Sequence, residues 1–198
     1  MFRLDNILER WAELYTPLSH ITKKPTFFRI SMIDADSYFV RNYNKMSGAC
    51  MAYATHIDAE LAKQNPKAIT YRHVIYFLVK QPAGTLSKTS ITDEEGATEA
   101  RFKTDDMVQD LLAVLWVMKS AAGGKSLPSP GGGPDVMKFI SDTVADAQYA
   151  DGLRGLQLDG AHWGTLPMMF NGWQVCGLTI EQVTPRMLCI NAEKYDQK

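Results

Sequence analysis

The stretch TDEEGATEARFKTDDMVQDLLAVLWVMKSA, residues 92–121, decides the fold. It opens with a Ser/Thr-x-x-Glu capping box, Thr92 to Glu95, whose acidic residues suit the positive end of a helix dipole. Gly123 and Gly124 follow it and are typical of a helix stop. Gly96 leaves open a shorter helix that begins at Thr104.

The apolar residues of this stretch recur at helical spacing and form a broad face: Met107, Leu111, Val114, Leu115 and Met118, widened by Val108, Leu112, Trp116 and Val117. A face so broad must be covered, and strands on either side of it in the chain can cover it. We therefore predict a sheet wrapped on this helix, with Leu111, Leu115 and Phe77 in one core. The fold class is α+β, a mainly antiparallel sheet packed against a long central helix and an N-terminal helix.

Other segments supply these elements. The N-terminal helix ends at Pro17, and its one apolar face consists of Leu4, Ile7, Leu8, Trp11, Leu14 and Tyr15. Residues 69–80 are rich in β-branched and aromatic side chains and predict the central strand. Residues 26–33 predict another strand, and residues 49–61 alternate as in a strand although helix remains open. Residues 64–67 predict a turn.

The C-terminal third predicts a short helix and more strands. Asp135 is expected to cap the helix, which carries Val136, Phe139, Ile140 and Val144. Residues 153–159 are expected to form a strand. Asn171-Gly172 indicates a hairpin between residues 166–170 and 173–183, which Pro185 ends.

Composition limits the function classes. The 198 residues, 45% of them hydrophobic, predict a single domain, 1–198, with a Pro/Gly-rich loop at 125–134. A net charge of −1 provides no basic field for specific nucleic-acid binding. Lys23, Lys24 and Arg29 are interleaved with aromatic residues and could touch a phosphate backbone, but they do not outweigh this overall charge. Three cysteines without a CxxC pair favour neither a zinc site nor a disulfide framework. No apolar run approaches a membrane span, so we expect a soluble protein made in the cytoplasm.

Chemical motifs are weak. Residues 123–126, Gly-Gly-Lys-Ser, resemble the end of a P-loop, but Lys119 stands where that motif needs a glycine, and the segment follows a helix. His56, Asp58 and Glu60 could hold a metal from one strand face, although a polar strand face is far commoner. His162 and Trp163 lie in a glycine-flanked loop that could line a pocket, although loop packing is commoner. We therefore predict no catalytic, cofactor-binding or metal-binding residues and no enzyme.

The order of elements resembles the tail-terminator (tail-completion) and related head–tail joining proteins of tailed bacteriophages. The resemblance rests on the N-terminal helix, the strands at 26–33 and 69–80, the helix from Thr104 to Met118, and residues 171–181. It implies a virion protein, assembled in the host cytoplasm, whose subunits form a ring, commonly a hexamer, through which DNA can pass. Its implied partners are further copies of itself and the tail-tube and neck proteins, with no cofactor.

Two other functions remain open at this stage. One is a small soluble enzyme of unknown reaction, with His56, Asp58 and His162 as its best candidates. The other is a monomeric binding module.

Overall fold

The computed structural model describes residues 3–30, 48–54, 58–62, 65–80, 92–126, 133–166 and 173–185. The helices are α1 (Leu4–Leu14), α3 (Thr92–Ala122), α4 (Pro134–Ala145) and α5 (Ala147–Gly155). The strands are β1 (Phe27–Ile30), β2 (Ala49–Ala54), β3 (Asp58–Ala62), β4 (Asn65–Lys80), β5 (Leu156–Leu166) and β6 (Trp173–Pro185). None of the helices in these ranges is long and apolar enough to cross a membrane.

The strands form one mixed sheet in the order β1-β2-β4-β6-β5, with β3 also paired to β4. Among the described strands, β1 and β2 run parallel, whereas every other pair of neighbours is antiparallel. The long strand β4 is central: β6 pairs along it from Ala68 to Lys80, while β2 and β3 share its other edge. This confirms the α+β class and the central position predicted for residues 69–80.

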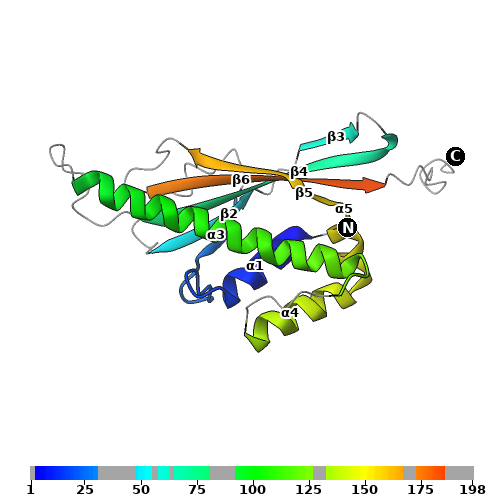
Figure 1. Ribbon diagram of the computed structural model, residues 1–198, viewed down its shortest axis with the longest axis horizontal. Helices are drawn as coiled ribbons and strands as arrows, with labels where there is room; N and C mark the ends of the chain where they lie inside the picture. Colours follow the sequence, from blue (N-terminus) through cyan, green and yellow to red (C-terminus); the bar gives the residue numbers. More distant parts are fainter. Residues whose placement is uncertain are drawn as a thin grey trace, which may run out of the picture.

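The four helices of the described residues lie on one side of the sheet, with α3 running along it (Figure 1). Helix α3 begins at Thr92, so Gly96 does not shorten it. It ends in a Schellman motif, in which the Lys125 N–H donates to the Ser120 carbonyl oxygen at 3.0 Å and Gly124 takes a φ of +79°. Residues 123–126 are therefore a helix terminus, as the absence of the P-loop glycine indicated.

Strand alternation selects the side chains that face the helices. Ile75 and Phe77 of β4 face them, as do their register partners Leu178 and Cys176 of β6. Leu111, Leu115 and Phe77 are fully buried in the same cluster, which confirms the predicted core. The opposite face of the sheet has a smaller buried cluster: Phe28, Ile30, Cys50, Ala52, Leu78, Trp173 and Val175.

Helix α1 belongs to this core, as its apolar face predicted. Leu4, Ile7, Leu8 and Trp11 are buried. Tyr15, just past the helix, stacks on Trp11 at 4.4 Å between ring centroids, and its hydroxyl donates to Asp110 of α3 at 2.7 Å.

Several predicted boundaries were wrong. Residues 65–67 belong to β4 and not to a turn. The register shifts between Leu61, which pairs with Ile69, and Ala62, which pairs with Asn65. Pro66 therefore lies at an irregularity of the ladder, where its missing N–H costs no regular hydrogen bond.

Three further corrections concern residues 133–166. Helix α4 begins at Pro134 after Gly133, because proline is pre-organised for the first helical position, and Asp135 lies in the first turn instead of capping it. Residues 153–155 end α5, so the strand predicted at 153–159 begins at Leu156. His162 and Trp163 lie in β5, not in a loop.

Two strand predictions were refined. Within the range 26–33, the described residues form strand β1 at Phe27–Ile30. Residues 49–61 contain β2 and most of β3. The hairpin arms β5 and β6 are antiparallel neighbours, as predicted. A two-residue turn at 171–172 followed by an unbroken ladder would place Leu166 opposite Gly177. In the structure Leu166 pairs with Val175 instead. The turn residues 171–172, most of the loop at 125–134 and the extension after Pro185 lie outside the described residues.

Candidate functional site

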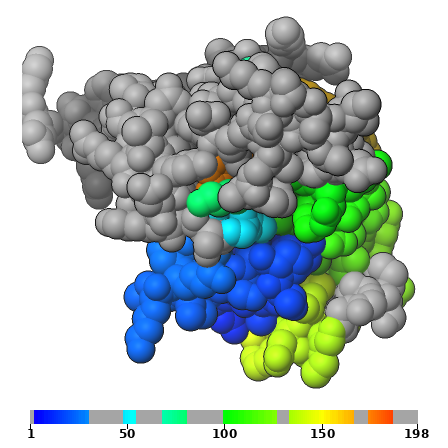
Figure 2. Space-filling model, turned by 90° about the vertical axis from the view of Figure 1, so that its left-hand side faces the viewer, coloured from blue at the N-terminus to red at the C-terminus, as the bar shows by residue number. Residues whose placement is uncertain are grey.

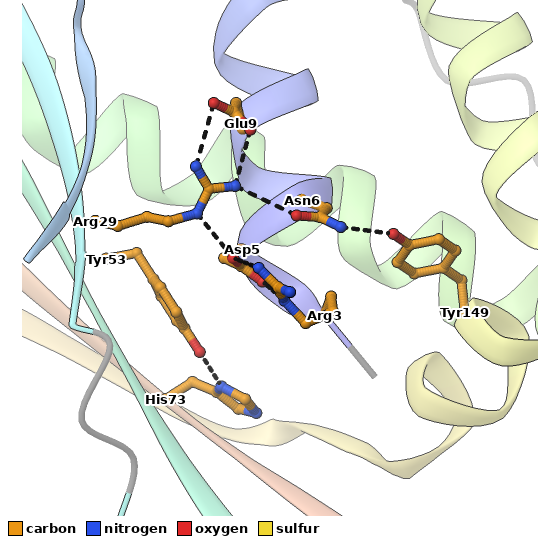
Figure 3. Close-up of polar contacts among 8 residues, drawn as sticks. All are labelled: Arg3, Asp5, Asn6, Glu9, Arg29, Tyr53, His73 and Tyr149. Carbon is orange, nitrogen blue, oxygen red and sulfur yellow. Dashed lines mark hydrogen bonds and ion pairs between the residues drawn. The ribbon is translucent and has the colours of Figure 1, made fainter. Parts of the chain in front are cut away.

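The most connected polar group of the described residues lies where α1 packs against β1 (Figure 3). Its centre is Arg29, which points from the short edge strand β1 towards the helix. The Arg29 Nε donates to Asp5 at 2.7 Å, and its Nη2 donates to Glu9 at 2.8 Å and to the Asn6 side-chain oxygen at 3.3 Å. Asp5 and Glu9 are four residues apart, so they share one helix face and can hold one guanidinium.

Asp5 is buried and has a second cationic partner. Arg3 donates to its two carboxylate oxygens at 2.9 and 2.8 Å. Hydrogen bonds from Arg3, and then from Arg29, lower the pKa of Asp5 to about 2 although burial opposes the shift. The pKa of Glu9 is also lowered, chiefly by Arg29. Both carboxylates therefore remain ionised at neutral pH and fasten α1 to the sheet edge.

A buried histidine lies on the helix side of the sheet close to this group. His73 of β4 is 3% exposed, and its Nδ1 lies 2.9 Å from the Tyr53 hydroxyl of β2. Its Nε2 lies 2.9 Å from the Gln182 side-chain oxygen of β6. The arrangement fits a neutral imidazole that donates from Nε2 and accepts from Tyr53. Burial lowers the pKa of His73, although the Gln182 contact opposes that shift.

Acidification should destabilise this region in two steps. As pH falls below 6.5, the ordinary pKa of histidine, the unfolded chain takes up a proton that His73 resists, so the free energy of unfolding falls. Between pH 3.8 and about 2, protonation of Asp5 in the unfolded chain adds a second loss. Urea denaturation across these ranges measures both steps.

The variant His73→Gln, which keeps a hydrogen-bonding side chain, is expected to weaken the first step and to preserve the second. A wild-type midpoint that does not change between about pH 7.5 and 5.5 would contradict the role of His73.

A cavity of about 330 Å³ opens between α1, α4 and the start of α5. Ile7 and Phe139, both buried, give it an apolar floor. Asn6 and Tyr149 line one wall, where the Asn6 amide donates to the Tyr149 hydroxyl at 3.0 Å. Through Asn6, this wall connects to the group around Arg29.

Charged side chains surround the cavity: Arg10, Lys138, Asp135, Asp142 and Asp146. Both cations have carboxylate partners, because Arg10 pairs with Glu13 and Lys138 pairs with Asp142. Asp142 is therefore neutralised by Lys138, and among the described residues Asp135 and Asp146 are the lining carboxylates without a cationic partner. This arrangement can accept an apolar group that carries positive charge.

The structure does not bring the sequence candidates for catalysis together. His162 is exposed on the edge strand β5 and lies opposite Thr179, whereas Asp58 is in β3 opposite Arg72. Strands β4 and β6 separate them, a spacing of about 14 Å. His56 lies outside the described residues. Arg29, considered for phosphate contact, is instead bound to two carboxylates.

The thiols of the described residues do not form a reactive site. Burial raises the pKa of Cys50 to about 12 and that of Cys176 to about 11. Both are therefore protonated at neutral pH. Within the described ranges, no three His, Cys, Asp or Glu side chains gather to hold a metal ion.

Sequence reasoning missed the group around Arg29, although a signal was present. Arg29 lies between Phe28 and Ile30 in an apolar strand, where a charged side chain needs a partner. Asp5 and Glu9 lie four residues apart beside the apolar face of α1. The cavity left no comparable signal, because its walls come from segments more than 120 residues apart in the chain.

No protein-family model, curated protein or solved structure matches the chain.

Proposed function

We propose that the chain is a structural subunit that assembles with copies of itself into a ring at the end of a phage tail tube, as a tail terminator or head–tail connector. The observation that carries the proposal is a pair of exposed aromatic side chains on the outer face of α3. The resemblance in element order supports it independently. The tail-tube and neck proteins are the proposed neighbours of the ring.

The outer face of α3 carries two large exposed aromatic side chains. Phe102 is 63% exposed and Trp116 is 46% exposed. They are 14 residues apart, four turns of helix, so they project in nearly the same direction about 21 Å from each other. Both point away from the sheet, because Leu111 and Leu115 on the other face are fully buried.

Such aromatics are typical anchors of protein interfaces. Phe and Trp bury large areas and dominate interface energetics. Between the two aromatics the exposed positions 106, 109 and 113 carry Asp, Gln and Ala, so one charged side chain accompanies the two anchors. A surface of this kind on each subunit can meet a different surface on the next, and such heterologous contacts close into a ring when the rotation returns to its start.

The test is the oligomeric state of variants of this face. Phe102→Asp with Trp116→Asp should give a monomer where the wild-type chain associates, because the anchors lose their apolar area and gain charge. The folded monomer should keep its stability within about 1 kcal/mol, since both side chains are exposed. Light scattering across a concentration series measures the mass, and thermal unfolding measures stability.

Lys125→Asp, an exposed change just past the end of α3, is the matched control and should associate as the wild type does. A strictly monomeric wild type that also ignores tail-tube and neck proteins would overturn the proposal. That result would favour the monomeric binding module.

A further inference from the structure

The turn from Ile21 to Lys24, here named the knob, projects from the N-terminal segment. All four of its residues are exposed, and Ile21 is 56% exposed. The Lys24 N–H donates to the Ile21 carbonyl oxygen at 2.9 Å, and the reverse bond measures 3.4 Å. The knob therefore presents one large apolar side chain and two lysines on a closed turn. Figure 2 shows the blue N-terminal segment and the yellow-green α4 on the same side of the molecule.

The base of the knob is fixed to the domain. The His20 Nδ1 accepts hydrogen bonds from the backbone N–H groups of Thr26 at 3.0 Å and Phe27 at 3.1 Å. The backbone N–H of His20 donates to the carbonyl oxygen of Ala12 in α1 at 3.0 Å. A turn held at both ends loses little conformational freedom when it binds.

The knob and the cavity between α1 and α4 have complementary chemistry. The cavity has an apolar floor of Ile7 and Phe139, and two of its aspartates, Asp135 and Asp146, have no cationic partner among the described residues. Ile21 of the knob can pack on the apolar floor of the cavity, and the ammonium groups of Lys23 and Lys24 can pair with its carboxylates. The cavity lining includes no knob residue, so the knob does not occupy the cavity of its own chain.

We propose that the knob of one copy docks in the cavity of the next copy. The inference rests on the proposed function, because it names a contact that joins neighbouring subunits. When the knob enters the next copy and the cavity receives the knob of a different copy, the contact is heterologous and can close into a ring. Two copies that fill each other's cavities would instead form a two-fold dimer, a result that overturns the ring. The outer face of α3 is then a second contact in the same assembly.

A charge exchange tests the contact. The first variant, Lys23→Glu with Lys24→Glu, should not assemble, because its acidic knob meets an acidic cavity. The second, Asp135→Lys with Asp142→Lys, should not assemble, because a basic knob meets a basic cavity. An equimolar mixture should restore assembly with alternating subunits, since each knob then finds a cavity of opposite charge.

The control is Arg72→Glu with Lys125→Glu, which changes the net charge of the chain by the same amount as the first variant at exposed sites away from the knob and the cavity. It should assemble as the wild type does. Thermal unfolding of each variant alone confirms that it is folded, and native mass spectrometry counts the two kinds of subunit in the mixture.

The outcomes separate this inference from the proposed function. An oligomeric wild type whose assembly survives the acidic knob, or a mixture that fails to assemble from two folded variants, overturns the knob contact and leaves the ring standing. A wild type that stays monomeric at about 1 mM overturns both.

Discussion

Leu115→Ala should lower the free energy of unfolding by about 2–5 kcal/mol, a large share of the roughly 5–15 kcal/mol that holds a domain together. Leu115 is fully buried in the core that α3 shares with β4 and β6. Removing its branched end leaves a cavity that rigid strands on one side and helices on the other can fill only in part. Urea denaturation gives the change, and assembly should be lost with the fold.

Lys119→Ala is the matched control one turn further along the same helix. Its ammonium lies 5.8 Å from the centroid of the Trp116 ring, a partly exposed contact worth no more than about 1 kcal/mol. The variant should therefore unfold close to the wild-type midpoint. If Leu115→Ala did the same, α3 would not be the helix on which the sheet packs.

Gly155→Ala should destabilise the fold by about 3 kcal/mol, although alanine is normally the better helix residue. Gly155 ends α5 where the chain enters β5, beside β6. A Cβ at this position would lie 2.4 Å from the backbone carbonyl oxygen of Val183. That atom belongs to a paired strand, so the junction or the strand must shift to relieve the clash.

Gly164→Ala provides the comparison in β5, because a Cβ there meets nothing within 4 Å. It should leave stability within about 1 kcal/mol of the wild type. Equal midpoints for the two alanine variants in chemical denaturation would show that α5 does not approach β6 as closely as described.

The fold was predictable where one segment carried its own periodicity. Helix α3 and strand β4 were found because their apolar residues repeat over many positions, and the helix terminus at Gly124 has a local chemical signal. Boundaries set by neighbours were not predictable. A proline usually marks a turn, but the irregular pairing between β3 and β4 accommodates Pro66 within β4. Helix α5 was missed because it is short and only a few of its residues are buried.

The candidate site was less predictable than the fold. Arg29 meets Asp5 and Glu9 only after β1 and α1 pack together. His73 finds Tyr53 and Gln182 through strand registers that no local pattern specifies. The catalytic candidates His162 and Asp58 lie on strands that β4 and β6 separate, a placement that no local pattern specifies.

The most direct test of the proposed ring is the mass of the purified wild-type particle by native mass spectrometry. A closed ring should appear as a single species whose mass is an integral multiple of the 22.2 kDa chain, sixfold for a hexamer, at all concentrations above the assembly threshold. A 22.2 kDa species that persists at every concentration and in the presence of tail-tube and neck proteins would contradict it.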